Sequence, residues 1–201
     1  MLYLAAFKIS FDQKNVVSMI DGRNMLKIIA GRQSDRKYRN VPVETDKIDR
    51  IIEAGRISPS ACNAQPWKFI IVDEPALKHK IAKAAAAKLV GMNVFINQAP
   101  LLIIIVREAP NFSSKVGATI KNKDYSRIDV GIAAENICLQ AEAEGLGSCM
   151  VGWFDEPQLK KLLSIPRSKR VELIITIGYS LSEQREKRRK PKEEVVSYNK
   201  Y

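Results

Sequence analysis

The residues best suited to chemistry lie in one polar loop that two prolines brace. The loop runs from Ser58 to Trp67 and reads Ser-Pro-Ser-Ala-Cys-Asn-Ala-Gln-Pro-Trp. Pro59 and Pro66 fix φ at their own positions and push the preceding residues toward extended geometry, which holds the amides of Asn63 and Gln65 in place. A side-chain amide carries donors and an acceptor together. That combination suits the edge of a heterocycle such as a flavin, where carbonyl oxygens alternate with a ring N–H.

A second stretch, Arg32 to Arg39, has the residue types of a phosphate clamp. It reads Arg-Gln-Ser-Asp-Arg-Lys-Tyr-Arg and directly follows Gly31. If the stretch is extended, the side chains of Arg32, Ser34 and Arg36 point the same way, because the strand period is two. Two guanidinium groups and a hydroxyl on one side suit a phosphate, which binds most strongly through charge-assisted, bidentate bonds. A solvated basic loop is the alternative interpretation.

The chain lacks the sequence signs of residue-based catalysis. The three cysteines, Cys62, Cys138 and Cys149, form no Cys-x-x-Cys pair, and His79 is the single histidine. This argues against zinc, and helical spacing from Leu77 directs His79 to solvent. No Gly-x-Ser-x-Gly elbow occurs, and no Gly-x-Gly-x-x-Gly follows an expected strand. Either the chain is not an enzyme, or a cofactor carries the reaction.

The composition is that of an ordinary globular protein. The chain has 201 residues, of which 46% are hydrophobic and 27% charged. We expect one domain over residues 21–201, preceded by an N-terminal arm, residues 1–20, whose structure the pattern does not define. No apolar run approaches the roughly 20 residues of a membrane span, and the first residues lack the features of a signal peptide. We therefore expect a cytoplasmic protein.

The charge balance is strongly basic, with 33 lysines and arginines against 22 acids and a net charge of +11. A clustered basic face is the electrostatic footprint of nucleic-acid binding. Here the basic residues are spread along the chain apart from residues 185–192, and no nucleic-acid-binding motif accompanies them. The pattern argues against a nucleic-acid partner, and a phosphate-bearing cofactor would explain part of the excess.

Apolar periodicity predicts the elements that position these residues. Helices are expected at residues 24–31, 45–55, 75–90, 129–144 and 155–163, and strands at residues 68–73, 101–106, 148–153 and 171–177. Asp129 is expected to cap the fourth helix, whose few polar positions favour either an internal pillar or half of a dimer interface. Residues 107–127 form a long polar excursion, which is either a lid or disordered.

Five motifs in order give the chain a resemblance to a known family. They are Arg32 to Tyr38, Ser58 to Trp67, Gln98-Ala99-Pro100 before a strand, Gly145-Leu146-Gly147-Ser148, and Arg189-Lys190-Pro191. Together they resemble the nitroreductase family of FMN-dependent oxidoreductases, from residue 24 to about residue 196. The resemblance implies an α+β fold with a central, mostly antiparallel sheet flanked by helices. It also implies an intertwined homodimer with two FMN sites at the subunit interface.

The resemblance also implies which residues contact FMN and in what role. The ribityl phosphate would be held by Arg32, Gln33, Ser34 and Arg36, with Lys187 and Arg189 from the tail. Pro59, Ser60, Ala61 and Asn63 would reach the flavin of the partner subunit. Val151, Gly152 and Trp153 would run along the isoalloxazine, with a backbone N–H near flavin N5. Gln33 departs from the family's common second cation.

The function that the resemblance implies is transfer of hydride from NADH or NADPH to FMN and reduction of a small oxidised acceptor. The acceptor would be a nitroaromatic, a quinone or a flavin, and flavin N5 rather than a side chain would carry the hydride. A flavin-binding or flavin-carrier dimer without nicotinamide turnover is one alternative. A basic nucleic-acid-binding protein is the other. The sequence fixes neither the acceptor nor the nicotinamide.

Overall fold

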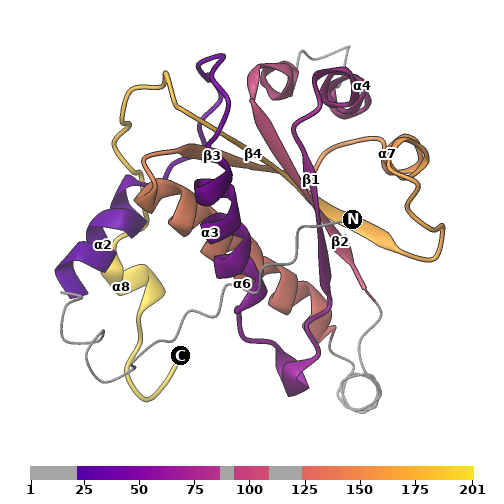
Figure 1. The fold of residues 1–201 in the computed structure, drawn as a ribbon. Helices are drawn as coiled ribbons and strands as arrows, with labels where there is room; N and C mark the ends of the chain where they lie inside the picture. The colour runs from indigo at the N-terminus through magenta and orange to yellow at the C-terminus, as the bar shows by residue number, and fades with distance from the viewer. Residues whose placement is uncertain (1–21, 87–92, 109–123) are drawn as a thin grey trace.

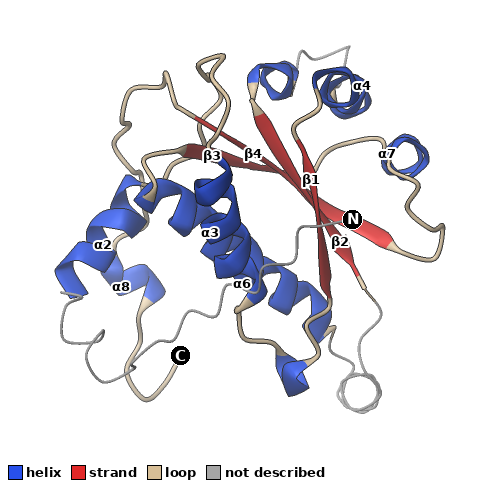
Figure 2. Cartoon of the chain, in the orientation of Figure 1, coloured by secondary structure: helices blue, strands red, loops and turns tan. Residues whose placement is uncertain are grey.

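The computed structural model describes residues 22–86, 93–108 and 124–201 (Figure 1). The expected N-terminal arm, most of the 107–127 excursion and the expected helical residues after position 86 lie outside these ranges. Figure 2 shows a sheet with helices on both of its faces, together with long loops. In the described residues, no helix combines the length and apolarity needed to cross a membrane.

Among the described residues, four strands form one sheet, and every pairing between these strands is antiparallel. In sequence order they are β1 (Trp67–Val72), β2 (Leu101–Arg107), β3 (Gly147–Val151) and β4 (Arg170–Gly178). Their order in the sheet is β1-β2-β4-β3. The expected α+β class with a mostly antiparallel sheet is therefore confirmed.

Strand β2 lies between two partners and is covered on both faces. All residues from Leu101 to Val106 are buried. Because successive side chains of a strand point to opposite faces, Leu102, Ile104 and Val106 join one hydrophobic cluster. Leu101, Ile103 and Ile105 join the other. The continuous apolar run is therefore explained by helices on both sides of the sheet.

One pair of helices covers each face of the sheet (Figure 2). Helices α3 (Thr45–Arg56) and α6 (Tyr125–Ala143) pack on one side, and α4 (Pro75–Ala85) and α7 (Glu156–Leu162) on the other. Helix α3 approaches α6 closely at Gly55, where an added Cβ would lie 2.8 Å from Ile137 Cδ1. The i, i+3, i+4, i+7 pattern that predicted α3 is therefore its contact face.

Two of the expected helix ends are wrong. Asp129 does not cap α6, which begins one turn earlier at Tyr125, and its side chain is instead buried inside the helix at 3% exposure. Helix α4 ends at Ala85 rather than near residue 90. The side chain of Asn93 donates a hydrogen bond to the carbonyl oxygen of Ala85 (3.1 Å), which satisfies one of the carbonyls that a helix end leaves open.

Helix α2 (Gly22–Gly31) and the short α8 (Lys192–Val195) are drawn at the same edge of the molecule in Figure 1. Helix α2 contacts α6 but buries none of its residues completely. Its apolar side chains remain exposed at Met25, Leu26 and Ile29. The edge formed by α2 is therefore less covered than the two faces of the sheet.

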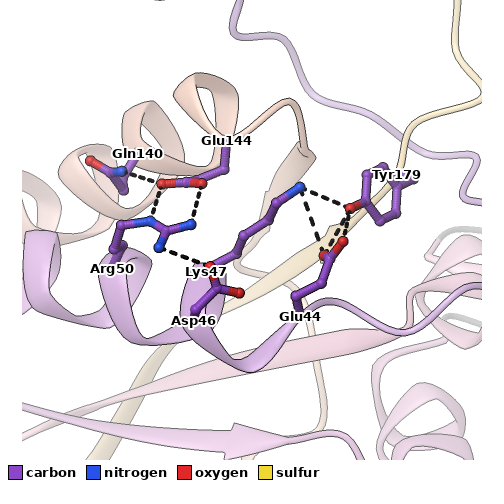
Figure 3. Close-up of polar contacts among 7 residues, drawn as sticks. All are labelled: Glu44, Asp46, Lys47, Arg50, Gln140, Glu144 and Tyr179. Atoms are coloured by element: carbon purple, nitrogen blue, oxygen red, sulfur yellow. Dashed lines mark hydrogen bonds and ion pairs between the residues drawn. The ribbon is translucent and has the colours of Figure 1, made fainter.

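A polar network ties α3 to the end of α6 and to the residue after β4 (Figure 3). Arg50 donates two hydrogen bonds to Glu144, from Nε (2.7 Å) and from a terminal nitrogen (2.8 Å), and a third to Asp46 (3.0 Å). Tyr179 accepts a hydrogen bond from Lys47 Nζ (2.8 Å) and donates its own to Glu44. The network therefore consists of two sets of contacts: Arg50 ties α3 to the end of α6, and Lys47 and Glu44 tie α3 to Tyr179 after β4.

Candidate functional site

A cleft of about 380 Å³ lies between the segment after α2 and the C-terminal tail. Two stretches of chain far apart in sequence line it, and its lining is mostly cationic. The lining residues are Arg32, Gln33, Ser34, Arg36, Arg185, Glu186, Lys187, Arg188 and Arg189. Six of these nine residues carry a positive charge and one carries a negative charge. The cleft therefore joins the two basic stretches that the sequence singled out.

The segment after α2 has the extended geometry that the sequence predicts. Ser34 forms a parallel bridge with Ser148 of β3, and Tyr38 forms an antiparallel bridge with Ser180. Side chains alternate along such a segment, so Gln33 and Asp35 point inward and are buried. The intervening side chains of Arg32, Ser34 and Arg36 are left to line the cleft.

Asp35 holds this segment in place through hydrogen bonds on its buried side. Its Oδ1 accepts hydrogen bonds from Gln33 Nε2 (3.0 Å) and Ser180 Oγ (2.8 Å), and its backbone N–H donates to the carbonyl oxygen of Ser148 (2.9 Å). Gly147 leaves room for the carboxylate, because a Cβ there would lie 2.6 Å from Asp35 Oδ2. The last glycine of the Gly145-Leu146-Gly147 motif therefore allows a close approach.

The tail is attached to the opposite wall through backbone carbonyl oxygens. Gln184 Nε2 donates to Gly31 (3.1 Å), Lys187 Nζ donates to Ile29 (2.6 Å), and a terminal nitrogen of Arg185 donates to Ser34 (2.7 Å). These bonds fix the tail without neutralising its charges, since carbonyl oxygens carry no net charge. The cations gathered in the cleft therefore stay largely uncompensated.

The charges of the cleft repel one another. Burial lowers the pKa of Lys187, and the neighbouring Arg32 and Arg189 lower it further. Two carboxylates oppose this repulsion in part: Glu135 Oε1 lies 3.5 Å from Arg32 Nε, and Glu142 interacts electrostatically with Arg32 and Lys187. Arg36 lies over the ring of Phe95, 5.8 Å from the ring centroid. An anion bound in the cleft would relieve this repulsion, because it would favour the charged form of each cation.

A model of the nitroreductase family matches residues 29–179, which is most of the chain. The chain belongs to the nitroreductase family. The match begins just before the cationic segment and ends just after β4. The resemblance carried by the five sequence motifs is therefore confirmed.

Individual nitroreductase relatives agree with the family assignment. The structure of an FMN-dependent nitroreductase from Clostridium difficile is 30% identical, with a TM-score of 0.73 over 88% of this chain and 99% of that one. An FMN reductase [NAD(P)H] from Bacillus subtilis is 27% identical over 183 residues, covering 85% of this chain and 72% of that protein. An iodotyrosine deiodinase from Thermotoga neapolitana is 27% identical over 168 residues, covering 74% and 84% respectively.

The proline-braced loop is held by hydrogen bonds and contains strained backbone. Cys62, Asn63 and Gln65 have positive φ values of 52°, 51° and 46°, a region that costs free energy for residues other than glycine. The extended geometry expected of Gln65, the residue before Pro66, is therefore wrong. Gln65 Nε2 donates to both the backbone oxygen and Oδ1 of Asn63, each at 3.2 Å. Gln65 therefore positions the amide of Asn63, and Asn63 itself remains exposed.

Asp129 supports the same loop from inside α6. Its Oδ1 accepts a hydrogen bond from the backbone N–H of Ala61 (3.1 Å). Asn136, two turns further along α6, donates to Ser58 Oγ (2.8 Å). The residue expected as a helix cap is therefore a buried support for a loop, a role that only the folded structure reveals.

The proline-braced loop and the cationic cleft lie in different parts of the folded molecule. Figure 1 shows the loop beyond the C-terminal end of α3, whereas the cleft is next to α2 and the tail. None of Pro59, Ser60, Ala61 and Asn63 lines the cleft. The resemblance assigned this loop to the partner's flavin, and that assignment stays a prediction.

The third expected contact region, residues 151–153, follows the end of β3. Trp153 is 67% exposed, so it is not part of the core, and its carbonyl oxygen accepts a hydrogen bond from Asn93 (2.9 Å). An added Cβ at Gly152 would meet no atom within 4 Å. In this stretch the backbone is therefore held at Trp153, and the surface is open at Gly152 and at the Trp153 side chain.

Several residues that shape the site are not evident from the sequence pattern. They are Asp35, Asn93, Arg185 and Arg188, together with the supporting role of Asp129. A signal existed for Asp35, because the period of two places it on the inward side between Ser34 and Arg36. No local signal connects Arg185 to Gln33, since 152 positions separate them.

Proposed function

We propose that this chain is an FMN-dependent oxidoreductase that takes hydride from NADH or NADPH and reduces a small oxidised acceptor. The observation that carries the proposal is the cleft, in which six cations meet one acid in a nitroreductase-family chain. A phosphate monoester is the part of FMN that such a cleft recognises. When bound, FMN supplies hydride acceptance and electron transfer at the isoalloxazine.

The protein residues would then bind and orient the cofactor. Arg32, Ser34 and Arg36 would contact the phosphate from one wall of the cleft, and Lys187 and Arg189 from the other. The extended segment bonded to β3 and the tail bonded to α2 keep the two walls in place. The stretch Val151 to Trp153, which is exposed at Gly152 and Trp153, would run along the ring.

We propose further that two copies form the complete site. The separation of Asn63 from the cleft supports this, and so do the exposed apolar side chains of α6, Ile128 at 47% and Ile132 at 36% exposure. Helix α6 already packs on the sheet through its other side, so these exposed apolar side chains favour packing against the surface of a second protein chain. Met25, Leu26 and Ile29 extend the apolar surface along α2.

The spectrum of the purified protein tests the cofactor directly. The protein should be yellow, and denaturation should release FMN. Anaerobic addition of NADH or NADPH should then bleach the flavin within seconds. Colourless protein that fails to bind added FMN would overturn the proposal, and a bound flavin that stays oxidised would indicate a carrier rather than a reductase.

Mixed dimers test whether the loop acts on the partner's site. Arg32→Ala damages a cleft, and Asn63→Ala damages a loop. If the two act across the interface, dimers with one copy of each variant contain one intact site, and reduction of FMN by NAD(P)H is partly restored. If they act within one chain, every site in the mixture is damaged and no activity returns.

The acceptor class remains a separate proposal. The named relatives include an FMN-dependent nitroreductase, an FMN reductase and an iodotyrosine deiodinase. We propose a small aromatic acceptor such as a nitroaromatic, a quinone or a free flavin, because Trp153 presents a large exposed ring next to the proposed flavin position. Replacement of Trp153 by Ala should raise KM for such acceptors by a larger factor than it slows reduction of the flavin by nicotinamide.

A further inference from the structure

The amide of Gln33 has no hydrogen-bonding position left for a ligand. Its nitrogen donates to Asp35 Oδ1 (3.0 Å) and to the carbonyl oxygen of Glu183 (3.0 Å). Its oxygen accepts from the backbone N–H (3.1 Å) and from Nε (3.3 Å) of Arg185. An amide has two donors and two acceptor lone pairs, so all four are used. A contact between this amide and a phosphate would break one of these bonds.

Arg185 is the residue that Gln33 holds most fully. Both its backbone and its guanidinium Nε bond to the Gln33 oxygen, and a terminal guanidinium nitrogen donates to the carbonyl oxygen of Ser34 (2.7 Å). The guanidinium group is therefore fixed at two points on the wall that also carries Arg32 and Ser34. Arg185 lines the cleft in this orientation.

We infer that Arg185 supplies to the phosphate cleft the cation that position 33 lacks, and that Gln33 is a positioning residue that acts through Arg185. The inference rests on the proposed function, because it names the ligand set of the same cleft. The resemblance implies a cation at the position of Gln33. In this chain the side chain of Gln33 is an inward-facing neutral amide, and Arg185 of the tail supplies the positive charge to the cleft.

The other attachments of the tail do not depend on Gln33. Gln184 bonds to Gly31 and Lys187 bonds to Ile29. Removing the amide of Gln33 therefore loosens the guanidinium of Arg185, which keeps only its bond to Ser34, and leaves the neighbouring attachments intact. This locality allows the effect of Gln33 on Arg185 to be measured separately from unfolding of the tail.

The test compares FMN with riboflavin, which lacks the phosphate, by fluorescence quenching on flavin-free protein. Arg185→Ala should raise the FMN Kd at least about tenfold, the scale of one hydrogen bond to a charged group, and should leave the riboflavin Kd unchanged. Gln33→Leu should do the same. Arg167→Ala, which removes an exposed cation outside the cleft, is the control and should change neither.

A double-mutant cycle separates a positioning residue from an independent ligand. If Gln33 acts through Arg185, the double variant binds FMN no more weakly than Arg185→Ala alone. Additive losses would overturn the positioning role, and an unchanged FMN Kd in Arg185→Ala would overturn the whole inference. Gln33→Asn, which shortens the amide and keeps its polarity, replaces Gln33→Leu if that variant does not fold.

Limited trypsin digestion without flavin provides a second readout. Release of Arg185 in Gln33→Leu should speed cleavage after this residue relative to the wild-type chain, and equal rates would overturn the positioning role. This arm stays informative if the wild-type chain binds no FMN. In that case the proposed function fails on the FMN titration, and the Gln33–Arg185 contact is still judged on its own.

Discussion

Two polar clusters of the molecule differ in how their charges are balanced. The network between α3 and α6 contains two cations and three acids, which are bonded to one another, to Gln140 or to Tyr179 (Figure 3). The cleft contains six cations and one acid. The charges of the network pair with one another, whereas the cleft has an excess of positive charge that a bound anion would balance.

The directions of the pKa shifts express the same difference. In the network, hydrogen bonds with Tyr179 lower the pKa of Glu44 and raise that of Lys47, so the charged forms are favoured. In the cleft, burial and the adjacent arginines lower the pKa of Lys187, so its charged form is disfavoured. Groups of the first kind stabilise the fold, and groups of the second kind are available to bind a ligand.

Replacing Asp35 should affect both stability and FMN binding, because Asp35 is a buried acid that supports the binding cleft. Asp35→Ala removes the acceptor for Gln33 and Ser180, and we expect the free energy of unfolding to fall by about 3 kcal/mol and FMN binding to weaken as well. Urea unfolding and FMN titration measure the two effects. Ser180→Ala removes one of the two donors and should have the smaller effect on both. An Asp35→Ala protein that keeps its stability and its FMN Kd would contradict the role given to Asp35.

Arg32→Ala should affect binding alone. Loss of one charge-assisted contact should weaken FMN by about 1.5 to 3 kcal/mol, or about ten- to a hundredfold in Kd. The melting temperature should change little, because the ion pair of Arg32 with Glu135 is long at 3.5 Å and partly exposed. Arg127→Ala is a matched control, since Arg127 has an equally long ion pair with Asp124 and does not line the cleft. An unchanged FMN Kd would remove Arg32 from the site.

Tyr179→Phe should have the opposite profile. It removes only the hydroxyl that accepts from Lys47 and donates to Glu44. We expect a loss of about 1 kcal/mol in the free energy of unfolding and an unchanged FMN Kd. Tyr198→Phe, at an exposed position near the C-terminus, should change neither quantity. If Tyr179→Phe weakened FMN binding, the two clusters would not be independent.

The sequence predicts those parts of this molecule that depend on local period. The apolar period of 3.6 located α3, and the period of two placed Arg32, Ser34 and Arg36 together on the cleft. The same period places Gln33 on the inward side, which agrees with its saturated amide better than a role as a phosphate ligand does. Contacts between distant segments could not be read in this way, because the pairing of Gln33 with Arg185 and that of Asp129 with Ala61 exist only after folding.

The smallest expected effect concerns the pH dependence of the network at Glu144. Hydrogen bonds from Arg50 chiefly hold the pKa of Glu144 below its ordinary value, against the opposing effect of burial. A carboxyl group whose pKa is lower in the folded state contributes stability that is fully present above its unfolded pKa, about 4.3. That stability is lost as the pH falls through the folded pKa. The difference in unfolding free energy between the wild-type chain and Glu144→Gln should therefore be constant down to about pH 5 and shrink at lower pH. Urea unfolding at a series of pH values measures this difference.

The same comparison in an Arg50→Ala background should show a much weaker dependence, because the partner that shifts the pKa is gone. A difference that persists undiminished at about pH 3 would show that Arg50 and Glu144 are not coupled through charge.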